Sequence, residues 1–299
     1  MNNAVFPLHL FPDNVRLQVI KNFDHLQLIS FSLVSRKSKT LVQSFSVKIA
    51  AFTVWVRGSL SICIGGFEIE FSIYQNNTRG PVRELKSLDA VSNYVLVEAE
   101  INEQRVAFEL QNPRLSFNQW FQYLRSLFKF KNDQIIFNNE HEIYDTVALR
   151  NLLPQWRFLE IQRGSHDYVR RILDVFCPCV KHIRTGLMVN FREFPQKVSI
   201  QNLDSINILN SWILLTTLSW VRGANPRMNS AYMWIVGPPN REKLLKGITH
   251  QAEPEDLDQE RDEHGRIRES ITIRSKKGIP ATLITDRSII WTIQMSVGN

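Results

Sequence analysis

The stretch that most constrains the fold of this chain is residues 6–42, which predicts three short helices. Pro12 and Asp13 stand where the first helix should begin, and Asp13 is expected to be its N-cap. Asp24 and Ser35 are expected to cap the second and third helices, and apolar residues recur inside each helix at helical spacing. Three helices of this size cannot bury all their apolar surface against one another. Part of that surface must therefore contact the rest of the chain or another protein.

In its order of residues this stretch resembles an F-box. The family pattern has a Leu-Pro start, a Val, an Ile-Leu pair, two further leucines and a Val-Ser-basic run. The corresponding positions, in register and without a gap, are Phe11-Pro12, Val15, Val19-Ile20, Phe23, Leu28 and Leu33-Val34-Ser35-Arg36-Lys37. Ser38 stands where many members carry tryptophan, which should weaken the third helix more than the docking surface. The alternative interpretation is an ordinary three-helix start of a globular domain.

The resemblance implies that residues 6–47 form an F-box that docks to a Skp-type linker and, through it, to a cullin-based ubiquitin ligase. The residues that would form or support the linker-binding surface are Phe11, Pro12, Val15, Val19, Ile20, Leu28 and Val34. The opening Phe6-Pro7-Leu8 fits a branch of the family in which the F-box precedes a type 2 F-box-associated domain.

Residues 48–112 predict an antiparallel β segment. They begin with a run rich in β-branched and aromatic residues, which is broken at Arg57-Gly58 and Gly65-Gly66. Glycine-containing breaks between alternating runs are typical of hairpins. The expected strands are residues 50–56, 59–64 and 68–74, followed by a hairpin of residues 94–100 and 105–110.

Residues 113–299 predict alternating helices and strands, and the overall fold class is therefore α+β. Consecutive β-α units indicate a largely parallel sheet. The spacing of the strands indicates a curved, irregular leucine-rich-repeat-like β/α layer, with an ordinary α/β domain as the alternative. The expected helices are 117–130, 144–153, 167–176 and 206–221, and the expected strands are 134–137, 158–161, 180–184, 197–201, 232–236, 270–273, 281–284 and 289–295.

A second, weaker resemblance lies at about residues 195–236. Ser211-Trp212-Ile213, followed by Gly223-Ala224-Asn225-Pro226, is similar to the signature of the type 2 F-box-associated domain. The resemblance implies that residues 113–299 bind the substrate protein. The chain departs from the pattern because Ser219-Trp220-Val221 repeats the tryptophan motif, as an insertion of about two helical turns would. The charged stretch 252–269 is expected to be an exposed loop.

The sequence predicts that the protein is not an enzyme and that it binds neither a cofactor nor a metal ion. Cys177 and Cys179 with His182 have metal-ligand side chains, but a structural zinc needs four ligands and a second pair is missing. Small buried thiols beside a helix end are the expected alternative. Glu140, Glu142 and Asp145 are interpreted as capping the helix that follows them rather than as paired catalytic acids. The remaining histidines form no nucleophile–base pattern.

The net charge is +7, and the basic residues are dispersed along the chain. A solvated basic face or attraction to acidic partners is favoured over nucleic-acid binding. Three cysteines make no disulfide framework, so a cytoplasmic or nuclear location is expected. The N-terminus lacks a secretory pattern, and the longest apolar stretch, 208–221, is too short and polar for a membrane span. The favoured function is a substrate-recognition adaptor, and the alternative is a non-catalytic basic scaffold or nucleic-acid-binding protein.

Overall fold

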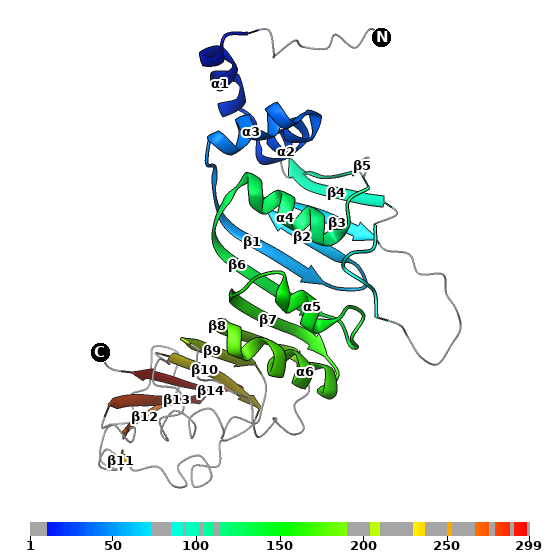
Figure 1. Cartoon of the computed structure of the whole chain (residues 1–299). Coiled ribbons are helices and arrows are strands. Elements are labelled where there is room, and N and C mark those ends of the chain that lie inside the picture. Colours follow the sequence, from blue (N-terminus) through cyan, green and yellow to red (C-terminus); the bar gives the residue numbers. More distant parts are fainter. Residues whose placement is uncertain are drawn as a thin grey trace.

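The structure is a computed structural model. It describes residues 11–72, 85–91, 94–101, 104–110, 114–189, 204–209, 230–236, 250–252, 267–274, 279–287 and 290–297. Three helices at the N-terminal end precede a long mixed sheet, and three further helices lie on one face of that sheet (Figure 1). This is an α+β arrangement with the N-terminal helices where the sequence predicts them.

The N-terminal helices are α1 (Asp13–Lys21), α2 (His25–Val34) and α3 (Arg36–Ser44). Asp24 and Ser35 cap α2 and α3 through their side chains, so both predictions are confirmed. The prediction for Asp13 is wrong, because Pro12 is the N-cap and Asp13 is the first helical residue. Pro12 has an extended backbone, and its carbonyl accepts hydrogen bonds from the N–H groups of residues 15 and 16.

The first strands form an antiparallel meander, as predicted, in which each strand pairs with the next. The strands are β1 (Lys48–Val56), β2 (Leu60–Ile64), β3 (Phe67–Ser72), β4 (Tyr94–Ile101) and β5 (Gln104–Leu110). Gly65 and Gly66 both have positive φ and make the two-residue turn between β2 and β3. Such a turn matches the twist of the flanking strands, and its φ values favour glycine.

The middle of the sheet is parallel. β1 pairs in parallel with β6, so the N-terminal meander and the later strands form one sheet. The parallel strands that follow β1 are β6 (Lys129–Asn138), β7 (Trp156–Gly164), β8 (Val180–Val189), β9 (Ser205–Leu209) and β10 (Ser230–Val236). Parallel neighbours require crossover connections. The connections that lead to β6, β7 and β8 contain α4 (Phe117–Leu127), α5 (Thr146–Asn151) and α6 (His166–Phe176).

The C-terminal strands close the sheet in antiparallel pairs. They are β11 (His250–Ala252), β12 (Ile267–Arg274), β13 (Pro280–Arg287) and β14 (Ile290–Val297). The 14 strands in the described residues have the order β11-β12-β13-β14-β10-β9-β8-β7-β6-β1-β2-β3-β4-β5. The described elements do not confirm a leucine-rich-repeat-like layer. The division of the chain at residues 112 and 113 stays a prediction.

The structure changes several predicted boundaries. The helix expected at 206–221 is wrong at its start, because Ser205–Leu209 is β9, in which isoleucine and asparagine alternate with the period of a strand. The helix expected at 117–130 ends at residue 127, because Phe128 is extended and the next N–H bonds to the carbonyl of Val47. Residues 197–201 and 210–229, including Trp212 and Trp220, lie outside the described residues.

The core lies between the sheet and α4, α5 and α6 (Figure 1). In β1 the residues Phe52, Val54 and Val56 are buried, whereas those between them are partly exposed. Phe52 meets Phe121 of α4 edge to face, with ring centroids 5.1 Å apart. One face of this part of the sheet therefore carries the helices. Among the described helices, none is long and apolar enough to cross a membrane.

Candidate functional site

The predicted linker-binding residues divide into an exposed group and a buried group. Val34, the last residue of α2, is 67% exposed, and Pro12 is exposed as well. Phe11, Val15 and Val19 are partly exposed. These five residues are the ones that a partner can contact while the helices remain folded.

Ile20 and Leu28 belong to the buried group, with 1% and 4% of their surfaces exposed. Burial of one such side chain contributes about 1.5–3 kcal/mol to folding. Both residues therefore hold α1 and α2 against the core and support the surface from inside. A substitution of either would test the folding of the helices rather than contact with a partner.

Caps formed within the sequence define where α2 and α3 begin. Asp24 Oδ1 accepts a hydrogen bond of 2.7 Å from the Gln27 N–H, and Gln27 Oε1 accepts one of 2.9 Å from the Asp24 N–H. Ser35 Oγ accepts a bond of 3.1 Å from the N–H of Ser38, whose side chain is buried. Caps of this kind contribute about 1 kcal/mol each. The position of Val34 next to the Ser35 cap is fixed by these bonds.

Tyr123 of α4 joins the N-terminal helices to the sheet domain. Ser32 Oγ donates to the carbonyl of Ile29, and it lies 2.7 Å from the Tyr123 hydroxyl, which must therefore act as the donor in that pair. The Lys39 ammonium lies 4.5 Å from the centre of the Tyr123 ring. Burial raises the pKa of Tyr123, so its hydroxyl keeps the proton that it donates. Next to it, Gln43 Nε2 donates to the Ser126 carbonyl at 3.0 Å.

A second junction joins His25, the first residue of α2, to the turn between β2 and β3. A Cβ atom at Gly65 would lie 2.3 Å from His25 Nδ1, so glycine is the residue that leaves room for the ring. The ring also meets Phe128 edge to face, with centroids 6.0 Å apart. Two independent contacts, through Tyr123 and through His25, thus fix the orientation of the N-terminal helices relative to the sheet.

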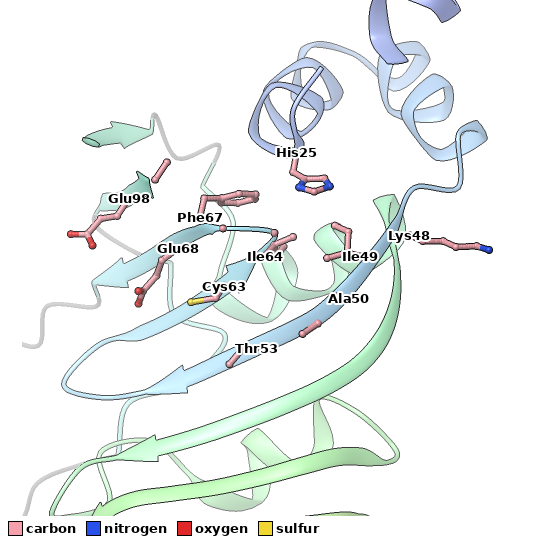
Figure 2. A pocket seen from close by; sticks show the side chains of 14 residues that line it. His25, Lys48, Ile49, Ala50, Thr53, Cys63, Ile64, Phe67, Glu68 and Glu98 are labelled. Atoms are coloured by element: carbon pink, nitrogen blue, oxygen red, sulfur yellow. The ribbon is translucent and has the colours of Figure 1, made fainter. Parts of the chain in front are cut away.

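A groove of about 770 Å³ lies beside His25, where β1 to β4 meet α2 (Figure 2). Its walls combine apolar side chains such as Ile49 and Phe67 with the carboxylates of Glu68 and Glu98. Burial, reinforced by the charge of Glu68, raises the pKa of the Cys63 thiol in this groove to about 12. The thiol is therefore protonated at neutral pH, and a protonated thiol is a poor nucleophile.

Cys177 and Cys179 are buried in the short 3₁₀ turn that follows α6, as predicted. Burial raises the pKa of both thiols, and Cys179 Sγ donates to the Phe176 carbonyl. The structure does not bring His182 into the same environment. Its ring stacks on Phe158 at 4.5 Å, and its Nδ1 lies 2.8 Å from an oxygen of Ser205. The described part of the chain contains no group of three or more metal-ligating side chains.

The three acids before α5 have different partners. Asp145 accepts from the Val147 N–H at 2.8 Å and caps α5, and Glu142 accepts from the N–H and hydroxyl of Thr146. These two capping predictions are confirmed. Glu140 instead pairs with Arg163, and this hydrogen bond and the charge of the guanidinium lower the pKa of Glu140.

The sequence alone predicts neither the junction at Tyr123 nor the junction at His25. The sequence indicates a turn at Gly65, but nothing in it indicates that His25 lies against this residue. Tyr123 was one of several aromatic residues in a predicted helix, and its bond to Ser32 joins residues 91 positions apart. Only the packing of α2 against α4 and against the β2–β3 turn brings these groups together.

Comparison with protein families finds an F-box domain at residues 8–50. This range covers the three N-terminal helices and the first residues of β1. F-box domains bind the Skp-type linker and so connect to cullin, and an F-box domain implies a role as an adaptor of an SCF-type (Skp–cullin–F-box) ubiquitin ligase. No curated protein and no solved structure matches the chain in the corresponding comparisons.

Proposed function

We propose that this chain is the substrate-recognition adaptor of an SCF-type ubiquitin ligase, in which the region after the F-box recruits the protein to be ubiquitinated. The F-box domain at residues 8–50 is the observation that carries the proposal. The exposed Val34 and Pro12 and the partly exposed Val15 provide the surface for the linker. The sheet domain provides the surface for the substrate protein.

Such an adaptor acts by proximity. It performs no chemistry and needs no cofactor, because holding two proteins together makes transfer between them effectively intramolecular. The gain in the rate of transfer depends on how firmly the linker-binding and substrate-binding surfaces are held in one relative orientation. The contacts of Tyr123 with Ser32 and of His25 with Gly65 support the proposal, since they fix the F-box to the sheet. A cytoplasmic or nuclear location fits three unpaired cysteines.

The region after the F-box, by this proposal, is related to the type 2 F-box-associated domain. The support is the order of elements, an F-box followed by β structure, together with the Trp212 and Gly223-Ala224-Asn225-Pro226 motifs in the sequence. The repeated motif at Trp220 remains a departure from that pattern.

Val34→Lys tests the linker-binding surface without disturbing the core. Val34 is 67% exposed at the C-terminal end of α2, where a positive charge is favourable. The matched control is Val147→Lys, because Val147 is an exposed valine, at 43%, on α5. Val34→Lys should unfold at the same temperature as the wild type, whereas Val147→Lys places its charge in the first turn of α5 and should unfold at a slightly lower temperature.

Binding of a purified Skp-type linker is measured by calorimetry. The proposal predicts that Val34→Lys weakens binding at least about tenfold, because the ammonium would be desolvated in the interface, whereas Val147→Lys binds as the wild type does. No linker binding by the wild type would reject the adaptor function. Specific binding of RNA or of a scaffold partner without the linker would then favour the alternative.

A further inference from the structure

One face of the sheet between β4 and β8 carries no described helix. Side chains alternate between the two faces of each strand, and the helices cover the face that contains Val54 and Ile135. On the opposite face, which we call the open face, Thr53, Trp55 and Gln134 are partly exposed. Because none of the described helices covers the open face, a partner can reach it.

The strand register aligns one residue from each strand into a continuous row across the open face. Every member of this row is partly exposed, and most are polar. From β4 to β9 the row consists of Glu98, Glu68, Cys63, Thr53, Gln134, Phe158, His182 and Ser205. Figure 2 shows Glu68, Cys63 and Thr53 side by side across β3, β2 and β1, where the row enters the groove beside His25.

The open face is acidic although the chain as a whole has a net charge of +7. Its carboxylates are the paired Glu68 and Glu98 of adjacent strands, Glu70 on β3 and Glu160 on β7. The cations on the same face of the described strands are Arg57 at the end of β1 and Arg184 on β8, which stands opposite Glu160. The guanidinium carbon of Arg157 lies 5.7 Å from the centre of the Phe158 ring. Lys48 lines the groove beside His25. An acidic surface on a basic protein favours a positively charged partner.

Arg57 shows how this face holds a cation. Its guanidinium carbon lies 4.2 Å from the centre of the Trp55 ring, and its Nη1 lies 2.9 Å from Glu68 Oε1. An aromatic ring beside a carboxylate is a favourable site for arginine or lysine. On β7, Phe158 and Glu160 also stand on the open face two positions apart. There the Phe158 ring stacks on His182, and Glu160 accepts hydrogen bonds from Gln134 and Gln162.

We propose that the open face binds an extended lysine- and arginine-rich segment of a partner protein. This rests on the proposed function, since the segment would belong to the recruited protein. Seven strands from β4 to β8 are about 29 Å wide at a spacing of about 4.8 Å, which an extended chain of about nine residues crosses. The carboxylates bind the charged groups, and the rings of Trp55 and Phe158 contact the aliphatic stems.

The test uses the full chain and a fluorescein-labelled peptide of about ten residues, with arginine and serine alternating. Fluorescence anisotropy compares wild type with the Glu70→Gln/Glu160→Gln variant, which keeps side-chain shape and removes two charges from the open face. The control is Asp167→Asn/Asp174→Asn, which changes the net charge equally at two exposed residues of α6. A glutamate–serine peptide and an oligouridine RNA serve as competing probes.

The proposal predicts that the basic peptide binds and that the glutamine variant binds about three- to tenfold more weakly, with less than a twofold change in the control. The proposal is overturned if the control weakens binding equally, if the acidic peptide or the RNA binds more tightly, or if the basic peptide does not bind. Skp-type linker binding is measured on the same samples. Linker binding without peptide binding rejects this inference alone, and peptide binding without linker binding rejects the proposed function alone.

Discussion

Gly65→Ala should break the junction between the F-box and the sheet. Gly65 is in the β2–β3 turn with φ of +53°, and a Cβ atom there would lie 2.3 Å from His25 Nδ1. The neighbouring Gly66, with φ of +95°, has no atom within 4 Å of the equivalent Cβ position. The two glycines therefore separate backbone strain, which both substitutions introduce, from the clash with His25, which only one introduces.

The expected magnitude has two parts. A non-glycine residue in the left-handed region costs about 1–2 kcal/mol. The clash then displaces the His25 ring and removes its edge-to-face contact with Phe128, and such a contact contributes about 0.5–1.5 kcal/mol. Gly65→Ala should lower the free energy of unfolding by about 1.5–3.5 kcal/mol in total. Gly66→Ala should lower the free energy of unfolding only by the contribution of backbone strain, about 1–2 kcal/mol.

A double-mutant cycle with His25→Ala measures the clash directly. Free energies of unfolding are determined by urea denaturation for each single variant and for the two double variants. His25→Ala removes the ring that Gly65→Ala would displace, so together these should cost about 1 kcal/mol less than the sum of the single effects. His25→Ala and Gly66→Ala should be additive. Additivity in both cycles would refute the idea that Gly65 is required by its contact with His25.

Three further predictions concern single side chains. Tyr123→Phe removes the donor to the buried Ser32 and should lower the free energy of unfolding by about 1 kcal/mol in urea; no change would show that the bond does not stabilise the junction. Burial lowers the pKa of His182 from its ordinary value of 6.5, so the folded state binds fewer protons and stability falls as the pH drops through this value. The melting temperature of His182→Asn should then fall less than that of the wild type as the pH drops through this range. Equal decreases in the two melting temperatures would contradict this prediction. Burial raises the pKa of Cys63 and Cys177, so mass spectrometry should find both unmodified by iodoacetamide at neutral pH until urea is added. Rapid labelling of either thiol in the native protein would contradict its raised pKa.

Features that depend on neighbouring residues could be predicted from the sequence. Asp24 and Ser35 predicted the starts of α2 and α3, because a cap needs only the residues of the first turn. Gly65-Gly66 predicted the hairpin of β2 and β3, because a tight turn also depends only on neighbouring residues. The F-box was recognisable because its pattern lies within one short stretch.

Features that depend on distant pairing could not be predicted. β1 lies between β2 and β6, and the parallel partner of Lys48 is Lys129, far along the chain. The acidic open face exists only once the register aligns strands from separate parts of the sequence. The helix expected at residues 206–221 fails for a related reason. The alternation in β9 is only five residues long, and pairing with β8 and β10 stabilises the strand.

The most direct test of the adaptor function is whether the full chain enters a complex with the Skp-type linker and cullin. The three purified proteins are mixed, and the mass of the complex is measured by light scattering during size-exclusion chromatography. The account predicts that the mass of the linker–cullin complex rises by that of one chain, 34.9 kDa. An unchanged mass, with the chain eluting separately, would contradict it.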